Sequence, residues 1–370
     1  MLVSVYAIAT NPNRVTPPSC SRTSLAKRMR SGRRLACIAL SARRAMSTKR
    51  VGVLVKDGHA AWPPRLNGCD ADLINAATSE ELQAKTSSID ALVWVPGVAA
   101  AEVTQAFETL KPRWVHSFPA GVDGLSGFLS SEALQSRTVP VTNGKGAFSS
   151  SLAEYVIAAI MHFTKQIPRC LTNQKEKKWD PFVMDVVQGK TVGFVGYGHI
   201  AQQTAVLCKA LGMRIIACRR SSGGEDVVAP SQTYAPADRL KLFAEADYVV
   251  CSLPGTSHTQ NFCGAQEFGA MKSTGVFVSL GRGAAVDEAA LVDVLQKGQI
   301  RGAALDVFKE EPLPASSPLW ALGDKIWITA HNADLTEDYF DLGWAVFADN
   351  YRSFASGEPL KTPIEVSRGY

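Results

Sequence analysis

The sequence predicts two α/β domains, each built on a doubly wound parallel sheet. Short apolar runs alternate with longer segments of helical character from Arg50 onward, as in parallel sheets covered on both faces. The runs fall into two series, and a glycine-rich turn directly follows the first run of the second series. The chain has 370 residues, 46% of them apolar and 20% charged, which is enough for two globular domains.

The first domain is predicted from four apolar runs at residues 51–55, 91–95, 114–118 and 139–142. About forty residues follow His331, and they include an aromatic-rich helix candidate at 337–354. This tail is too short for a further domain, so we expect it to pack on the first sheet. The first domain is then discontinuous and flavodoxin-like, with residues 48–148 and 338–370.

The second domain is predicted at residues 149–337. Its six apolar runs make one complete doubly wound sheet, at residues 191–195, 214–218, 248–252, 275–279, 302–306 and 326–329. A helix from Ser149 to Phe163 opens the domain and joins it to the first. Ser151 and Glu154 have the spacing of a capping box at its start.

Residues 1–47 form a basic leader. The first 50 residues contain 11 Lys and Arg and no Asp or Glu, a composition that indicates a transit peptide for a mitochondrion or chloroplast. The alternatives are a disordered basic arm, or an upstream extension that is not translated when Met46 is the start, which would leave a cytoplasmic protein. The apolar run at 35–40 is too short to cross a bilayer, and no membrane partner is expected.

The remaining charge and the cysteines restrict the class of protein further. Beyond residue 50 there are 28 Lys and Arg against 34 Asp and Glu, so the body is acidic and no nucleic-acid partner is expected. The eight cysteines include no CxxC pair. Reduced, structural thiols are therefore expected, and no metal site is predicted.

The glycine-rich turn predicts a dinucleotide site. Gly196 permits a tight turn, Gly198 lets backbone approach a pyrophosphate, and the following helix supplies the positive end of its dipole. Ala201, at the third position, is small enough for close packing of helix on strand. The expected Rossmann contacts are at Gly196, Tyr197, Gly198, His199 and Ile200, the alternative being an incidental glycine turn.

The end of the next strand predicts which nicotinamide cofactor is bound. An acidic residue there would accept bonds from a ribose 2′-hydroxyl, but the sequence reads Arg219, Arg220, Ser221. Paired guanidiniums and a hydroxyl suit a 2′-phosphate, which favours NADPH and leaves NADH as the lesser alternative. The other interpretation is two solvated surface arginines.

Arg282, Glu311 and His331 form the candidate catalytic set. Reduction of a 2-keto acid needs a cation for the substrate carboxylate, an acid for the carbonyl oxygen, and a group that keeps this acid charged. Each residue also has an ordinary structural interpretation: a turn cation, one of several loop charges, and a histidine at a strand end. Their order and their positions after strands favour the catalytic interpretation.

From about residue 50 to its end, the chain resembles the D-isomer-specific 2-hydroxyacid dehydrogenases. The segment from Trp114 to Asp123 is most similar to the glyoxylate and hydroxypyruvate reductase branch. The motifs that carry the resemblance are Ala120-Gly-Val-Asp123, Gly196-x-Gly198, Leu253-Pro254-x-Thr256-x-x-Thr259, Gly281-Arg-Gly283 with Asp287, and Ala304-Leu-Asp-Val-Phe308 leading to Glu311-Pro312 and His331.

The resemblance implies a role for each matching residue. Arg282 would bind the substrate carboxylate and polarise the carbonyl, His331 would donate the proton, and Glu311 would pair with His331. Asp306 would meet the nicotinamide carboxamide, and backbone amides at Gly97 and Val98 would complete the carboxylate site. Further cofactor contacts are implied at Leu253, Pro254, Thr259 and Gly281. A homodimer is also implied, with the contact expected at residues 174–182 around Trp179.

Two departures from the family concern the segment around His331. Family members commonly carry proline before this histidine, whereas this chain has Ala330, and the following residues 332–336 differ from the usual small-residue run. Loss of the proline removes a backbone constraint on the imidazole. Asp334 is close to His331 in sequence, where it can shift the pKa of the imidazole or contact the substrate.

The expected function is NADPH-dependent reduction of glyoxylate or hydroxypyruvate to the D-2-hydroxy acid. A 3-phosphoglycerate dehydrogenase-like enzyme ranks lower, because the chain ends soon after His331 and no basic cluster can be assigned to the phosphate. The third interpretation is a nucleotide-sensing protein resembling the C-terminal-binding corepressors, against which the transit-like leader argues.

Overall fold

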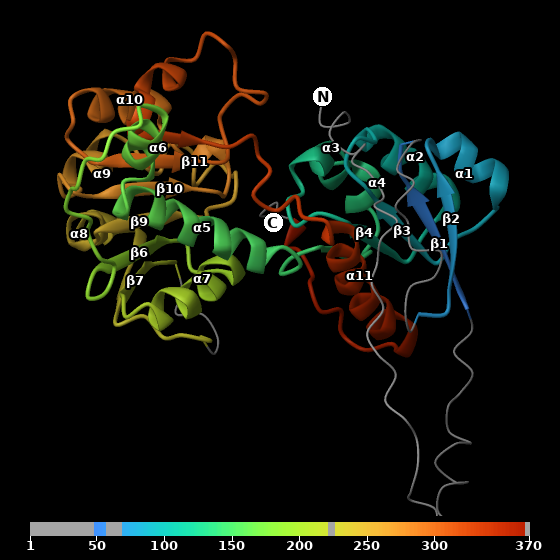
Figure 1. Ribbon diagram of the computed structural model, residues 1–370. Coiled ribbons are helices and arrows are strands. Elements are labelled where there is room, and N and C mark those ends of the chain that lie inside the picture. The colour runs from blue at the N-terminus through green and yellow to red at the C-terminus, as the bar shows by residue number, and fades with distance from the viewer. Residues whose placement is uncertain (1–47, 57–68, 221–225, 367–370) are drawn as a thin grey trace, which may run out of the picture.

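The computed structural model describes residues 48–56, 69–220 and 226–366, which form two α/β domains (Figure 1). The predicted leader at 1–47 and the predicted cofactor residue Ser221 lie outside the described residues. Each domain contains one parallel sheet, as the apolar runs predicted.

The sheet of the first domain has five strands in the order β2-β1-β3-β4-β5, which is the flavodoxin-like order. Helices α1 and α2 cover one face, where Leu82, Val103 and Phe107 pack on Leu54 and Leu92. The elements are β1 (Lys49–Leu54), β2 (Ala71–Ala76), α1 (Ser79–Lys85), β3 (Ala91–Trp94), α2 (Ala100–Leu110), β4 (Trp114–Ser117), η2 (Asp123–Leu125), α3 (Ser126–Leu129), α4 (Glu132–Gln135) and β5 (Val141–Asn143).

The other face of this sheet is covered by the C-terminal helix α11 (Tyr339–Ser356), drawn in dark red beside β4 in Figure 1. Trp114 of β4 stacks on Phe347 of α11 with ring centres 5.2 Å apart. Beyond the helix, the N–H of Ile364 donates to the Val141 carbonyl. The tail therefore packs on the first sheet, as its aromatic pattern predicted.

The sheet of the second domain has seven parallel strands in the order β12-β11-β10-β9-β6-β7-β8. This is the Rossmann order with one strand added at an edge. The strands are β6 (Thr191–Val195), β7 (Arg214–Cys218), β8 (Gln232–Tyr234), β9 (Tyr248–Cys251), β10 (Val276–Ser279), β11 (Gly302–Leu305) and β12 (Ile326–Ile328).

Helices cover both faces of the second sheet. Residues of α5 and α7 pack on one face, and residues of α8, α9 and α10 pack on the other. The helices are α5 (Ser149–Thr164), α6 (Ile167–Lys175), α7 (His199–Ala210), η3 (Pro236–Asp238), α8 (Arg239–Glu245), α9 (Ala265–Ala270), η4 (Gly283–Ala285), α10 (Glu288–Gln296) and η5 (Pro318–Lys325). Among the described residues, no helix is long and apolar enough to span a membrane.

Helix α5 joins the domains as predicted, but the predicted capping box is wrong. The residue that precedes the helix is Phe148, and no side chain caps the first turn. Ser151 lies inside the first turn and donates its hydroxyl to the Ala333 carbonyl at 2.5 Å. A tertiary contact with the segment after β12 therefore uses the hydroxyl that local capping would have used.

The strands β2 and β8 were not predicted from the sequence, and both lie at sheet edges. β2 is an edge strand with only Ala76 fully buried, and in β8 no residue is buried. An edge strand faces solvent along one side, so its side chains need not form the continuous apolar run that marks a central strand.

Candidate active site

The three candidate catalytic residues follow three neighbouring strands. Arg282 comes after β10, Glu311 after β11 and His331 after β12, and these strands are adjacent in the order β12-β11-β10. In parallel sheets the carboxyl ends of neighbouring strands lie at the same edge, where ligands bind. The fold therefore brings together residues that are up to 49 positions apart in the chain.

His331 and Glu311 form a direct pair. Nδ1 of His331 lies 2.7 Å from Oε2 of Glu311, and the Phe308 N–H donates to Oε1 of the same carboxylate at 2.9 Å. The bond with Glu311 raises the pKa of His331 against the lowering effect of burial. Partial burial raises the pKa of Glu311, but the bonds from His331 and Phe308 outweigh it and lower the pKa overall. The pair therefore favours an imidazolium beside a carboxylate.

The backbone of His331 is held in a left-handed conformation, with φ 49°. Residues other than glycine rarely adopt this region, and such strain is common at functional sites. The His331 N–H donates to the Asp306 carbonyl at 2.9 Å. The Asp306 carboxylate accepts bonds from the Thr329 hydroxyl at 2.6 Å and from the N–H groups of Asn332 at 3.1 Å and Ala333 at 3.3 Å.

Asp306 therefore positions the segment 329–333, which carries His331. Its side chain is buried, with the residue 1% exposed. The contact with a nicotinamide carboxamide that the resemblance implies stays a prediction, since the carboxylate already accepts three bonds from its own chain.

The position before His331 has its own hydrogen bond. The Ala330 N–H donates to Oδ1 of Asn332 at 3.2 Å, a bond that proline could not make. Asp334 lies in the electrostatic range of His331, Asp306 and Arg282, and burial is the main cause that raises its pKa. The segment thus replaces the constraint of a proline ring with hydrogen bonds.

Arg282 reaches across the gap between the two domains. Its Nε donates to Oδ2 of Asp123 at 2.7 Å, and its Nη1 donates to the Gly281 carbonyl at 2.8 Å. Asp123 comes from the first domain, at the start of η2. The guanidinium keeps further N–H groups for a ligand, because it carries five donors.

Gly121 leaves the space that this guanidinium occupies. A Cβ built at Gly121 would lie 1.6 Å from Nη2 of Arg282, far inside van der Waals contact. Gly255 packs on the other side, where a Cβ would lie 3.3 Å from Cγ of Arg282. The motif from Ala120 to Asp123 therefore supplies both a space and a carboxylate for Arg282.

The glycine-rich turn has the form a dinucleotide site requires. Gly196 has φ 87°, and its N–H donates to the carbonyl of Cys218, the last residue of β7, at 2.9 Å. A Cβ at Gly198 would meet no atom within 4 Å, so the surface at the N-terminus of α7 is open. His199 is exposed there, whereas the Tyr197 ring is buried and donates its hydroxyl to the Val228 carbonyl at 2.6 Å. Backbone therefore faces the site at Tyr197.

The loop after β9 packs against this turn. Leu253 lies against Gly196, and a Cβ at Gly281 would lie 2.4 Å from the Leu253 carbonyl oxygen. The Thr259 hydroxyl donates to the Pro254 carbonyl at 2.5 Å. The structure places the predicted residues Leu253, Pro254 and Thr259 in one loop beside Gly281.

The two arginines after β7 differ in their surroundings. Arg219 is largely enclosed, and its two terminal nitrogens donate to the carboxylate of Asp226 at 2.7 and 2.8 Å. Arg220 is exposed. The predicted contact of Arg219 with a 2′-phosphate stays a prediction, because an internal carboxylate already occupies that side of the guanidinium.

The predicted carboxylate site at Gly97 and Val98 follows β3. Gly97 has φ 102°, the Val98 carbonyl accepts the Trp94 indole N–H at 2.8 Å, and the Val98 N–H makes a long bond of 3.5 Å to Val95. Lys56, which follows β1, lies beside Gly97 with its Cδ 3.6 Å from the position of a Cβ there. The structure places this turn at the carboxyl edge of the first sheet.

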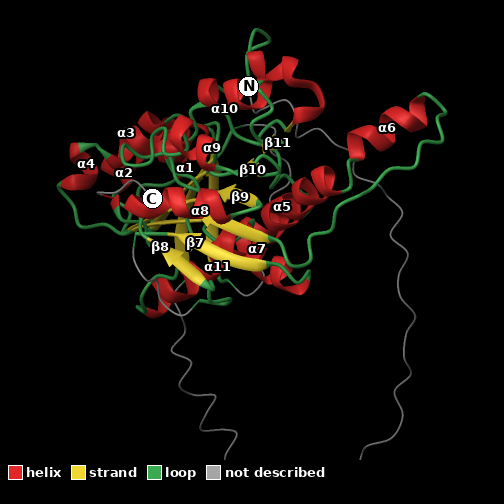
Figure 2. Cartoon of the chain, turned by 90° about the vertical axis from the view of Figure 1, so that its left-hand side faces the viewer, coloured by secondary structure: helices red, strands yellow, loops and turns green. Residues whose placement is uncertain are grey.

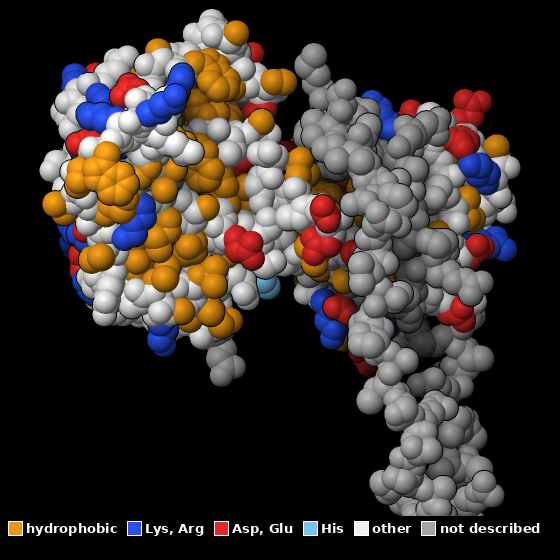
Figure 3. All heavy atoms as spheres, in the orientation of Figure 1, with side chains coloured by type: hydrophobic (Ala, Val, Ile, Leu, Met, Phe, Trp, Pro, Cys, Tyr) orange, Lys and Arg blue, Asp and Glu red, His pale blue; other side chains and the backbone are white. Residues whose placement is uncertain are grey.

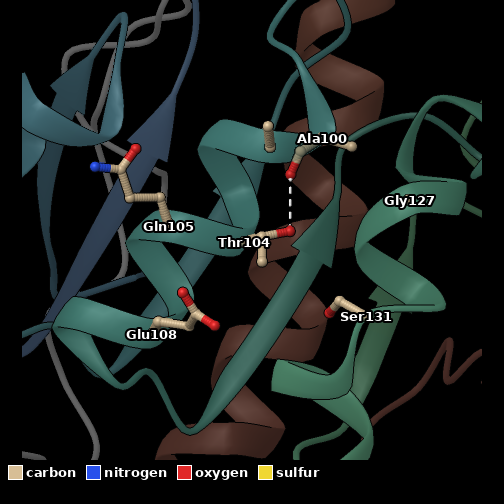
Figure 4. Close-up of a pocket in the computed structure, with 7 residues that line it drawn as sticks. Ala100, Thr104, Gln105, Glu108, Gly127 and Ser131 are labelled. Atoms are coloured by element: carbon tan, nitrogen blue, oxygen red, sulfur yellow. Dashed lines mark hydrogen bonds between the residues drawn. The ribbon is translucent and has the colours of Figure 1, made fainter.

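A separate depression lies in the first domain, beside α2 and α3 (Figure 4). Its lining includes Thr104, Gln105, Glu108 and Ser131, and the Thr104 hydroxyl donates to the Ala100 carbonyl at 3.1 Å. Glu108 is its one charged lining residue, so the depression does not suit an anionic substrate.

Several residues that build the site could not be predicted from the sequence. Asp123 was part of a quoted motif, but its partner lies 159 positions away, so no local pattern indicated the contact. The bonds of Thr329, Asn332 and Ala333 to Asp306 likewise had no signal in the sequence beyond proximity to His331.

Comparisons with known proteins agree with this geometry. Residues 157–333 match the NAD-binding domain of the D-isomer specific 2-hydroxyacid dehydrogenases. A glyoxylate reductase of Korarchaeum cryptofilum is 31% identical over 267 residues, covering 70% of this chain and 77% of the relative. A D-isomer specific 2-hydroxyacid dehydrogenase family protein from Aeromonas salmonicida has a solved structure that is 28% identical, with a TM-score of 0.71, covering 86% of this chain and 100% of that one.

A third relative is longer than this chain. The D-3-phosphoglycerate dehydrogenase of Methanocaldococcus jannaschii is 31% identical over 301 residues, covering 80% of this chain, and the match spans 56% of that protein's length. The fold, the site geometry and these matches lead to one assignment: the chain belongs to the D-isomer-specific 2-hydroxyacid dehydrogenase family.

Proposed function

We propose that this chain catalyses the NADPH-dependent reduction of a short 2-keto acid, glyoxylate or hydroxypyruvate, to the D-2-hydroxy acid. The observation that carries the proposal is the hydrogen-bonded pair of His331 and Glu311, whose side-chain atoms are 2.7 Å apart. Arg282 follows β10, at the same edge of the sheet. An acid that stays charged and a guanidinium for a carboxylate are the groups this reaction needs.

The role of each catalytic side chain follows from which of its nitrogen atoms already form hydrogen bonds within the protein. Glu311 engages Nδ1 of His331, so Nε2 donates the proton to the carbonyl oxygen of the substrate. The N–H groups of Arg282 that Asp123 and Gly281 leave unused bind the substrate carboxylate and polarise the carbonyl. Backbone at Gly97 and Val98 approaches the same carboxylate from the first domain.

A nicotinamide dinucleotide fits the second domain. The open surface at Gly198 and the positive φ at Gly196 allow backbone to approach a pyrophosphate at the N-terminus of α7. When bound, the cofactor supplies the hydride that reduces the carbonyl carbon. The arginines at 219 and 220 and the absence of an acidic residue directly after β7 support NADPH, with NADH as an alternative.

The test is the loss of NADPH absorbance with glyoxylate and with hydroxypyruvate, repeated with NADH, on the full chain. Arg282→Ala is the negative variant, and Arg301→Ala, a second-domain arginine whose guanidinium bonds to the Phe163 carbonyl, is the matched control. Turnover that survives in the control and vanishes in Arg282→Ala supports the proposal. Tight nucleotide binding without turnover of either acid contradicts it and favours the nucleotide-sensing alternative.

A 3-phosphoglycerate dehydrogenase-like activity is the second candidate, because the relative from Methanocaldococcus jannaschii carries that name. Lys56 beside Gly97 is a cation at the edge of the first sheet that a substrate phosphate could reach. Oxidation of 3-phosphoglycerate with NAD⁺ or NADP⁺ separates the two enzymes. If kcat/KM for 3-phosphoglycerate exceeded that for both short acids, 3-phosphoglycerate dehydrogenase would become the preferred function and the reductase the second candidate.

We also propose a homodimer formed through the second domain. Helix α6 projects from the body, with the following segment beside it (Figure 2). Large apolar side chains are exposed on both. They gather where α5, α6 and α7 lie, over the left-hand domain in Figure 3. The exposed residues include Ile167, Leu171, Trp179 and Val183, with Trp179 95% exposed. Sedimentation of wild type and Trp179→Glu would test this, since a monomeric wild type contradicts it.

The domain limits and the leader remain parts of the proposal. The packing of α11 on the first sheet supports a discontinuous first domain of residues 48–148 and 338–370 with 149–337 as the second. The acid-free composition of residues 1–47 supports import into an organelle. Imaging fluorescent fusions of the full chain and of a chain starting at Met46 tests the import, and identical cytoplasmic signals would contradict it.

A further inference from the structure

The ion pair of Arg219 and Asp226 lies beside the glycine-rich turn. Arg219 directly follows Cys218, whose carbonyl accepts the Gly196 N–H at 2.9 Å. The Arg219 guanidinium lies 5.5 Å from the centre of the Tyr197 ring. The pair is therefore at the carboxyl end of β7, where the adenosine ribose of a dinucleotide binds in this type of domain.

Asp226 occupies the fork of the guanidinium. Nη1 donates to Oδ1 at 2.7 Å and Nη2 donates to Oδ2 at 2.8 Å, and the side chains are only 14% and 11% exposed. Two parallel bonds to an oxyanion are the geometry in which arginine also binds phosphate. The hydrogen bonds to Arg219 lower the pKa of Asp226, so the carboxylate is charged at neutral pH.

The position of Asp226 is fixed by its neighbours. The N–H of Val227 donates to Oε1 of Gln202, on α7, at 3.2 Å. The Val228 carbonyl accepts the Tyr197 hydroxyl at 2.6 Å. The backbone that directly follows Asp226 is therefore tied to α7 and to the glycine-rich turn, which keeps Asp226 close to Arg219.

We infer that Asp226 sets the cofactor selectivity by competing with the 2′-phosphate of NADPH for Arg219. The inference rests on the proposed function, which requires a nicotinamide dinucleotide at this site. A phosphate monoester carries a charge of about −1.5 to −2 near neutral pH, so a carboxylate on the same arginine repels it. The 2′-hydroxyl of NADH is neutral and donates to a carboxylate, which has lone pairs beyond the two that Arg219 uses.

The consequence is a preference for NADPH that is smaller than the two arginines alone would give. Arg220 still favours the phosphate by its charge, and Asp226 reduces that advantage while it keeps NADH as a usable cofactor. Asp226 is thus a selectivity residue that the sequence did not indicate, because it follows Arg219 by seven positions rather than replacing it at the end of β7.

The experiment is isothermal titration calorimetry of the full chain with NADPH and with NADH. Asp226→Asn removes the charge and keeps the shape, and Asp226→Ser removes the charge with a smaller side chain in case the first variant does not fold. Glu245→Gln is the matched control, because Glu245 pairs with Arg214 at the opposite end of the same strand. Circular dichroism confirms that each variant is folded.

The affinity for NADPH should rise roughly tenfold in both Asp226 variants, relative to wild type and to Glu245→Gln. The affinity for NADH should stay equal or fall. An unchanged ratio of the two affinities overturns the inference, as does weaker NADPH binding, which would mean that Asp226 orients Arg219 for the phosphate. If wild type bound neither nucleotide, the proposed function itself would fail.

Discussion

Nε of Arg282 and Oδ2 of Asp123 lie 2.7 Å apart and belong to different domains. The cation that we propose for substrate binding lies in the second domain and is thus oriented by a carboxylate of the first. The ion pair is partly exposed, with Arg282 31% and Asp123 54% exposed, so solvent screening limits its contribution to stability. We expect its importance to lie in the direction in which the guanidinium points.

Replacing Asp123 by Asn should therefore reduce catalysis more than stability. Without the carboxylate the guanidinium is no longer oriented for a substrate, and kcat/KM for the keto acid should fall roughly tenfold to hundredfold. Steady-state kinetics and thermal unfolding would measure the two effects. Asp293→Asn is the control, since Asp293 is also 54% exposed and ion-paired, and equal losses in both variants would refute the positioning role.

Gly121→Ala should displace Arg282. The added Cβ would lie 1.6 Å from Nη2, so either the guanidinium or the loop from Ala120 to Asp123 has to move. We expect a loss of kcat/KM of about a hundredfold for the keto acid, with little change in the affinity for NADPH. Gly127→Ala is the control, because its Cβ would meet only Ala100 at 3.7 Å. Unchanged kinetics in Gly121→Ala would show that the loop adapts freely.

Glu311→Gln should move the pH profile of reduction. The Glu311 carboxylate raises the pKa of His331 above its ordinary value of 6.5, and the proposed mechanism of reduction needs the protonated imidazole. Wild-type kcat/KM should fall as the pH rises through this raised pKa. In the variant the fall should occur at a lower pH, because the carboxylate that raises the pKa of His331 is gone. The neighbouring variant Glu310→Gln should keep the wild-type profile, and a common profile for all three proteins would argue against the pair.

His116 should make the folded state sensitive to acid. It is fully buried in β4, its Nδ1 lies 2.7 Å from the Thr142 hydroxyl, and burial lowers its pKa from 6.5 to about 3. Between these two values the unfolded chain binds a proton that the folded chain does not. Stability from this group is therefore complete above pH 6.5 and is lost as the pH falls toward 3.

The slope from one such proton is about 1.4 kcal/mol per pH unit. Urea unfolding of wild type and His116→Asn at a series of pH values measures it. The variant should be less stable at pH 7, because it leaves a cavity, but its stability should depend less on pH. Parallel curves for the two proteins would mean that His116 does not titrate as expected.

The sequence predicted those parts of the fold that local patterns encode. Central strands such as β6 and β10 are buried at every position, so each appears as a continuous apolar run. The edge strand β8 has no such run and was missed. The start of α5 at Ser149 was predicted correctly, but its capping box was wrong, because the hydroxyl of Ser151 bonds to Ala333, a contact between residues 182 positions apart.

The sequence predicted that the three candidate catalytic residues lie together, but it did not predict all of their partners. Arg282, Glu311 and His331 follow strands in a fixed order, so the sequence indicated that they would meet at one edge of the sheet. The partners of the arginines were not predictable. Arg219 pairs with Asp226 after a turn, and Arg282 pairs with Asp123 across two domains, so both contacts depend on the tertiary structure.

The segment that carries His331 is held by hydrogen bonds to Asp306 and by the Ala330 bond to Asn332, with a left-handed residue at its centre. A few hydrogen bonds break at lower temperature than a packed core of apolar strands. Warming should therefore inactivate the enzyme before it melts: the rate of reduction would decline while circular dichroism still reports an intact fold, and cooling would restore the rate.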